Sequence, residues 1–129
     1  MENHITHNGS VTEEDFIFVT EGKKEMKLYF DEISHCKANG KGTLFYKVWL
    51  DKTKPQESYY MRKNIGFYFC KLTRAGFLRH HDSYMSNTKH FVNVDTENKY
   101  IIEITGGIFL PTSAGRKCVV IDYLNSRKG

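Results

Sequence analysis

The chain has 129 residues, of which 40% are hydrophobic, 26% are charged and only two are prolines. This length fits one domain, and the composition excludes disordered, collagen-like and disulfide-dense proteins. No apolar run approaches the roughly 18 residues of a membrane-spanning helix, and the N-terminus lacks a basic start followed by an apolar stretch, so we expect a cytoplasmic protein without a membrane partner.

The net charge of +4 is distributed unevenly along the chain. Residues 1–64 hold ten Lys and Arg against ten Asp and Glu, whereas residues 65–129 hold nine against five, so the whole excess lies in the second half. Such an asymmetry is compatible with an anionic partner such as nucleic acid, and also with an ordinary solvated surface.

The three cysteines, Cys36, Cys70 and Cys118, are widely spaced and form no Cys-x-x-Cys pair. This spacing predicts three buried, reduced thiols rather than a metal site or a thiol-exchange motif.

Residues 1–15 are polar and lack an apolar period, which predicts a flexible arm outside the fold. From Phe16 onward the pattern is that of short strands separated by turn residues. The strands expected in this half are 16–19, 26–30, 33–38, 43–50 and 58–62, with turns at 21–23 and 39–42 and a loop at 51–57.

A short helix is expected next, because Asn64 can act as its N-cap and Gly76 ends the pattern. Ile65, Phe69 and Leu72 form its apolar stripe. Further strands are expected at 77–80, 91–94, 100–104 and 108–110.

Thr112 and Ser113 can cap a final helix with Cys118, Ile121 and Leu124 on one side, before a frayed tail at 126–129. Eight or nine strands that follow one another across short turns, with two short helices, predict a mainly β, mostly antiparallel fold.

The densest cluster of reactive side chains is Arg79-His80-His81-Asp82-Ser83. A small hydrolase using His80, His81 and Asp82 is one interpretation, but adjacent residues on a strand point to opposite faces. The chain also lacks the common catalytic, metal-binding and phosphate-binding motifs. We therefore expect no catalysis, no metal and no cofactor.

The residues after the first helix carry a spaced pattern, in which Phe77, Arg79, His81, Ser83 and Asn87 stand in register. A later strand ends in Leu110-Pro111-Thr112-Ser113. The order and spacing of these residues resemble the LytTR DNA-binding domain, the output domain of many bacterial response regulators. The strands expected upstream are similar to the opening strands of the same domain.

The resemblance implies an elongated, mostly antiparallel, multi-sheet fold over residues 16–125, with loops that enter successive major grooves of duplex DNA. It implies contacts from three loops, at 39–43, 79–83 and 113–117. The residues that it implies at the DNA are Lys41, Thr43, Arg79, His81, Asp82, Ser83, Ser113, Arg116 and Lys117.

Other side chains of the pattern have simpler expected roles. Phe77, Tyr84 and Phe91 are expected in the core, and Asn87 is expected to be buried and bonded to backbone. His80 is expected to be packed or simply exposed, rather than to contact DNA.

The function implied is that of a stand-alone, sequence-specific regulator of transcription that binds double-stranded DNA. Domains of this type usually act in pairs on repeated half-sites, so a homodimer or cooperative pair is implied, with a separate signalling partner in place of a receiver domain. Two positions depart from the family pattern: Asp82 replaces the usual Arg, Lys or Asn, and Ala114 the usual Arg. These departures favour an alternative, a protein-interaction module that kept the fold and lost strong DNA binding.

Overall fold

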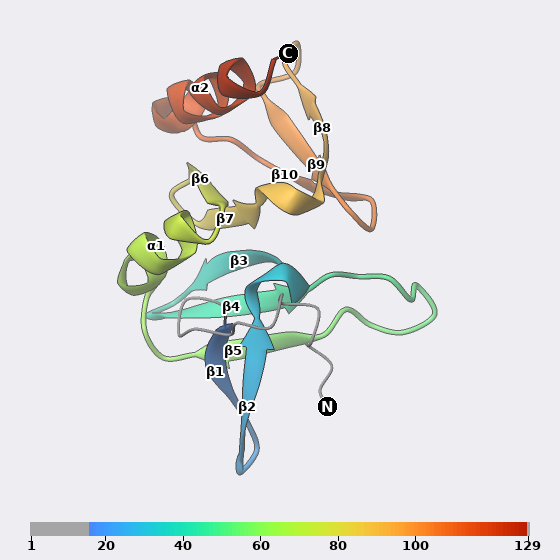
Figure 1. Ribbon diagram of the computed structural model, residues 1–129, viewed down its shortest axis with the longest axis vertical. Coiled ribbons are helices and arrows are strands. Elements are labelled where there is room, and N and C mark those ends of the chain that lie inside the picture. Colours follow the sequence, from blue (N-terminus) through green and yellow to red (C-terminus); the bar gives the residue numbers. More distant parts are fainter. Residues whose placement is uncertain (1–15, 129) are drawn as a thin grey trace.

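A computed structural model of the chain describes residues 16–128; the expected arm at 1–15 lies outside the described residues. Within them the chain forms ten strands and two α-helices, which confirms the mainly β expectation. Figure 1 shows an elongated arrangement, with β1 and β2 at one end and α2 at the other.

The elements follow the chain in this order: β1 (Phe16–Glu21), β2 (Lys24–Tyr29), η2 (Phe30–Glu32), β3 (Ile33–Asn39), β4 (Gly42–Lys47), β5 (Ser58–Met61), α1 (Ile65–Arg74), β6 (Phe77–His81), β7 (Tyr84–Asn87), η3 (Thr88–His90), β8 (Phe91–Asp95), β9 (Ile101–Ile104), β10 (Ile108–Leu110), η4 (Ala114–Arg116) and α2 (Lys117–Arg127). The strands form three sheets, with the orders β1-β2, β5-β4-β3-β7-β6 and β10-β9-β8. Every pairing is antiparallel, as the short turns between the strands predict.

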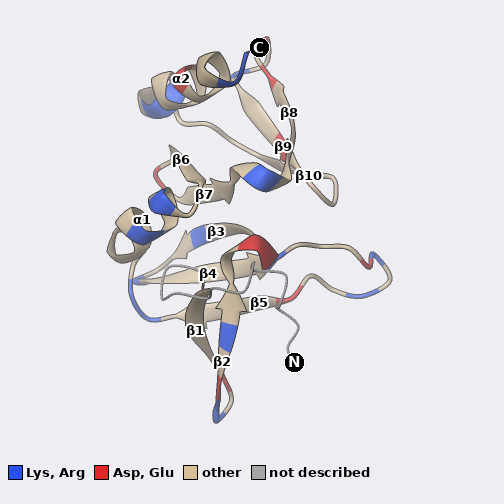
Figure 2. Ribbon diagram, in the orientation of Figure 1, with Lys and Arg blue, Asp and Glu red and all other residues tan. Residues whose placement is uncertain are grey.

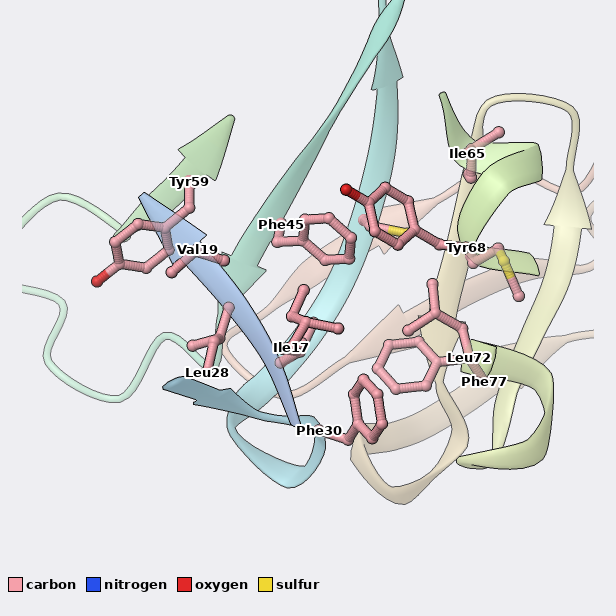
Figure 3. Packing of buried hydrophobic residues seen from close by; sticks show 13 residues of the cluster. Ile17, Val19, Leu28, Phe30, Phe45, Tyr59, Ile65, Tyr68, Leu72 and Phe77 are labelled. Carbon is pink, nitrogen blue, oxygen red and sulfur yellow. The ribbon is translucent and has the colours of Figure 1, made fainter. Parts of the chain in front are cut away.

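The larger hydrophobic core lies where the five-stranded sheet meets the β1-β2 hairpin and α1 (Figure 3). Phe45 and Leu72 are fully buried there, and the ring of Tyr68 meets Phe45 edge-on at a centroid distance of 4.9 Å. The buried stripe of α1 is Ile65, Tyr68 and Leu72. The prediction was wrong for Phe69, which is 37% exposed, because the helix turns its i+3 position rather than its i+4 position toward Phe45.

A second core joins the three-stranded sheet to α2 and is built on Ile102, Ile104, Leu110 and Val120. Leu78 of β6 and Tyr84 of β7 pack against it, whereas Phe77 and Met85 of the same strands lie in the first core. Strands β6 and β7 therefore contribute alternate residues to two cores, as side chains of period two allow.

Several expectations about core residues are confirmed. Phe77 is 3% exposed, and the half-buried Tyr84 and Phe91 pack against the second core. Asn87 is 2% exposed, and its side-chain amide donates to the carbonyl oxygens of Phe30 at 3.0 Å and Ile33 at 3.1 Å.

Other boundaries differ from the expected ones. The strand expected at 43–50 ends at Lys47, where the chain leaves the sheet and the Val48 N–H donates to the Glu32 carbonyl. Strand β7 was not expected, because its sequence Tyr84-Met85-Ser86-Asn87 has no polar alternation; its last three residues are all buried.

The final helix also differs from the expected one. Helix α2 begins at Lys117 after a 3₁₀ turn, the Ser113 side chain makes no capping bond, and Val120 is its buried residue. The helix continues to Arg127, so Ser126 and Arg127, which were expected in a frayed tail, belong to its last turn.

The cysteines fit the expectation only in part. Cys36 is buried, and burial raises the pKa of its thiol to about 12. Cys70 and Cys118 are exposed, so the prediction of three buried thiols was wrong for both. Neither α-helix in the described residues is long and apolar enough to cross a membrane.

Candidate nucleic-acid interface

Two turns that are far apart in the sequence lie side by side. The Ala38 N–H at the end of β3 donates to the carbonyl oxygen of Ser83 in the β6-β7 turn at 2.8 Å. Figure 1 shows the β3-β4 and β6-β7 turns on the same side of the molecule, away from the long β4-β5 loop. The exposed Lys41 in the β3-β4 turn therefore lies on the same surface of the molecule as the β6-β7 turn, and we call this surface the edge.

A third segment, the η4 turn, is tied to this edge through β6. The Ser113 N–H donates to the His80 carbonyl at 2.9 Å, and Nδ1 of His80 lies 2.8 Å from the Pro111 carbonyl. Because a carbonyl only accepts, Nδ1 is the donor, and Nε2 accepts from the Ser86 hydroxyl at 2.7 Å. These bonds fix the position of the segment before η4 relative to strands β6 and β7.

His80 is fully buried, so its ring serves the interior of the protein. Burial lowers its pKa to about 4, which keeps the imidazole neutral at physiological pH. The expectation that His80 is packed is confirmed. His80 therefore cannot join His81 and Asp82 in a hydrolase site, and residues 16–128 contain no group of three His, Cys, Asp or Glu that could hold a metal.

Asp82, in the β6-β7 turn, lies between two arginines. Arg116 Nε donates to Asp82 Oδ1 at 2.9 Å, and Arg79 Nη2 donates to the Asp82 carbonyl at 2.7 Å. The hydrogen bond and charge of Arg116 lower the pKa of Asp82, while burial and the neighbouring Arg116 lower that of Arg79. The turn thus gathers two guanidinium groups, and one carboxylate balances part of their charge.

His81 is half-buried at the start of the same turn. The Ser83 N–H donates to its Nδ1 at 3.0 Å, and its ring meets Tyr84 edge-on at a centroid distance of 5.4 Å. Because Nδ1 accepts a hydrogen bond, the neutral ring carries its proton on Nε2. Within residues 16–128 the structure gives Nε2 no hydrogen-bond partner, so this N–H is a candidate donor to a ligand.

Thr43 and Ser113 were also predicted to contact DNA, but neither presents its hydroxyl group at the edge. Thr43 is fully buried, and its hydroxyl donates to the Lys63 carbonyl at 2.9 Å. The Ser113 hydroxyl is also buried, and it has no hydrogen-bond partner in the part of the chain that the structure describes. The role of the Thr43 side chain at the surface is therefore corrected to a structural one, because burial removes it from any groove-facing surface.

Lys117 is exposed at the start of α2, with its ammonium 5.5 Å from the centroid of the Tyr100 ring. Lys37 was not predicted at the edge, yet it is exposed on β3 directly opposite Tyr84, with its ammonium 5.9 Å from the ring centroid. The local sequence carries no signal for Lys37, because only the pairing of β3 with β7 brings it to the β6-β7 turn.

Comparisons with known proteins agree with this geometry at the level of the fold. No family model and no curated protein matches the chain. Among solved structures, it is similar to one described as the LytTr DNA-binding domain of a methyl-accepting/DNA response regulator from Bacillus cereus. The two are 16% identical, with a TM-score of 0.70 over 85% of this chain and 96% of the other. The chain therefore has the fold of a LytTR-type domain.

Proposed function

We propose that this protein binds double-stranded DNA sequence-specifically and regulates transcription as a stand-alone protein. The observation that carries the proposal is the pair of arginines, Arg79 and Arg116, gathered at Asp82 beside His81. We call the surface formed by Lys37, Lys41, Arg79, His81, Arg116 and Lys117 the basic edge. The solved neighbour is described as a DNA-binding domain, which supports the same function.

The basic edge offers two kinds of contact with DNA. The flexible ammonium groups of Lys41 and Lys117 suit backbone phosphates, which hold a protein in register without reading sequence. Arg116 and the Nε2–H of His81 are donors, and the O6 and N7 atoms of guanine are acceptors in the major groove. Turns rather than a helix would then carry the sequence reading.

The proposal includes two copies on repeated half-sites, as a homodimer or a cooperative pair, and a separate partner that supplies the signal. Two-fold or tandem use of a small domain lengthens the recognised site, since a single module buries only a limited protein surface on DNA.

The test selects duplexes from a randomised pool and compares the best duplex with a scrambled one by fluorescence anisotropy at two salt concentrations. Two lysines provide a matched pair, because Lys23 and Lys41 each follow a turn glycine of positive φ, Gly22 at 64° and Gly40 at 59°. Lys41→Ala is expected to weaken binding to both duplexes about three- to tenfold and to flatten the salt dependence by about one counterion. Lys23→Ala, in the β1-β2 turn, is expected to leave binding unchanged.

One observation favours a second candidate, a protein-interaction module with the same fold. The Asp82 side chain is 78% exposed in the middle of the basic edge, where it would face phosphates. If no motif emerges from the selection, and both duplexes bind equally weakly at low salt and not at moderate salt, this second candidate replaces the first.

A further inference from the structure

A cavity of about 540 Å³ is lined in large part by the β4-β5 loop, which Figure 1 shows on the side away from the β3-β4 turn. It lies between η2, the β4-β5 loop, His90 of η3 and Thr105 after β9. Its volume falls within the range of roughly 300–1,000 Å³ that is typical of small-molecule sites. Its apolar lining comes from four residues of the loop, Val48, Trp49, Leu50 and Pro55.

The loop that lines the cavity is held in place by its own contacts. The indole N–H of Trp49 donates to the carbonyl oxygens of Asp51 at 3.2 Å and Lys54 at 2.9 Å. Lys52 lies over the Trp49 ring, 3.8 Å from its centroid, and its ammonium donates to the Gly106 carbonyl. The apolar wall is therefore formed before any ligand arrives.

Gly106 allows this close approach. Its φ is +98°, and a Cβ at this position would meet the Trp49 carbonyl oxygen at 3.1 Å. The absence of a side chain thus lets the loop sit against the segment after β9, whose Thr105 lines the cavity.

The charges around the cavity are mostly negative. The lining holds four carboxylates, from Asp31, Glu32, Asp51 and Glu57, against two ammonium groups, from Lys47 and Lys54. Lys47 lies 3.8 Å from Glu57, and the ammonium group of Lys52, just outside the lining, lies 3.8 Å from the centroid of the Trp49 ring. With Lys52 counted, the carboxylates exceed the ammonium groups by one. Figure 2 shows the acidic η2 on the side opposite the β3-β4 turn. Nε2 of His90 lies 2.9 Å from the Asp31 carbonyl, which makes Nε2 a donor.

We propose that this cavity binds a small organic cation, an ammonium group on an apolar body about the size of one aromatic ring. The apolar body would pack against Trp49 and Leu50, while the carboxylates attract the ammonium group. The charge disfavours nucleic acid here. The proposal does not depend on DNA binding.

Trp49 gives a direct readout, because it is the one tryptophan in the sequence and lines the cavity. The probes are three phenyl compounds of similar shape: phenethylammonium, 2-phenylethanol and phenylacetate. We expect a saturable change in Trp49 fluorescence with the cation, at least about tenfold weaker binding of the alcohol, and no binding of the anion. Equal binding of cation and alcohol, or no saturation by the cation at millimolar concentrations, would overturn the proposal.

Variants locate the site. Asp51→Asn keeps an oxygen acceptor for the Thr53 N–H and hydroxyl but removes one charge, so the cation should bind several-fold more weakly. Leu50 is 81% exposed, so Leu50→Lys should fold normally while its charge repels the cation and abolishes binding. Phe109→Lys is the matched control, because Phe109 is a similarly exposed apolar residue on β10, outside the cavity. Loss of binding in the control, or unchanged binding in Leu50→Lys, would refute the assignment.

Discussion

A single residue, Asp82, opposes the proposed DNA binding, because its side chain places a negative charge where the proposed ligand, DNA, is an anion. Its carboxylate binds Arg116 at 2.9 Å, so Arg116 is partly neutralised in the free protein. The side chains of both residues are at least partly exposed, at 78% for Asp82 and 31% for Arg116. An exposed ion pair contributes little to stability, so substitution of Asp82 tests DNA binding rather than folding.

Asp82→Asn should strengthen binding to both specific and scrambled duplexes, because it removes repulsion and frees Arg116 for a phosphate. We expect a gain of about three- to tenfold at low salt and a salt dependence steeper by about one counterion. The measurement is an anisotropy titration at several salt concentrations, with a thermal melt as the folding control. Weaker binding by a folded Asp82→Asn protein would instead assign Asp82 a positioning role toward Arg116.

Two buried histidines should make the free energy of unfolding depend on pH. His35 is 4% exposed and stacks on Tyr46 at a centroid distance of 4.5 Å, and His80 is fully buried. Burial lowers the pKa of both from 6.5 to about 4. Their stabilising effect is complete above pH 6.5, and it is lost as pH falls from 6.5 toward 4, because only the unfolded chain takes up the protons in this range.

From about pH 7.5 to about pH 5 the loss should be about 2 kcal/mol for each histidine, measured by urea unfolding at a series of pH values. His80→Gln is expected to lower the stability at neutral pH, since Gln cannot reproduce both ring bonds, but to flatten the pH dependence. A slope that is unchanged in His80→Gln would contradict the assignment of this proton to His80.

At the scale of elements, the local pattern of apolar and polar residues predicts strands and helices where one side of the element is buried and the other is exposed to solvent. It succeeds for α1, where Asn64 caps the helix by accepting from the Phe67 N–H at 2.9 Å. It fails for β7, which is covered on both faces and so shows no alternation. The same limit hides Lys37, whose place at the basic edge depends on strand pairing rather than on its neighbours in sequence.

Gly42 shows a constraint between elements. A Cβ at this position would stand 2.3 Å from the Met61 carbonyl oxygen and 2.4 Å from the Tyr60 ring, so β4 and β5 can pair closely only around a glycine. Gly42→Ala is expected to lower the free energy of unfolding by about 1–3 kcal/mol, because the backbone of Met61 must move. Chemical denaturation measures the change.

Gly115→Ala is the control for Gly42→Ala, because nothing lies within 4 Å of the added Cβ and the φ of Gly115 is not positive. We expect this control to change the stability by less than about 1 kcal/mol, in the stabilising direction. Equal losses in the two variants would show that the contact with β5 is not the cause.

At the scale of the whole molecule, the sequence predicts the type of fold more fully than the site. The order of short strands and two helices is enough for a mostly antiparallel fold, and the spaced residues from Phe77 to Asn87 are enough for the resemblance to LytTR domains. The proposed contacts of His81 and Arg116 depend on bonds between distant segments, such as Arg116 to Asp82, which no local pattern specifies. The cavity beside Trp49 is likewise formed by four separate segments.

The two hydrophobic cores share β6 and β7, and this sharing predicts that the molecule unfolds in one step. Val120 is fully buried at the α2 end of the second core, whereas Trp49 lies in the β4-β5 loop, outside both cores. Val120→Ala should lower the free energy of unfolding by about 1–3 kcal/mol through lost apolar burial and the cavity left behind. If the cores are coupled through β6 and β7, urea unfolding followed by Trp49 fluorescence and by far-ultraviolet circular dichroism should shift by the same amount. A shift of the dichroism transition alone would mean that the second core unfolds separately, and that the bonds from His80 to Pro111 and Ser86 do not couple the η4 turn to the central sheet.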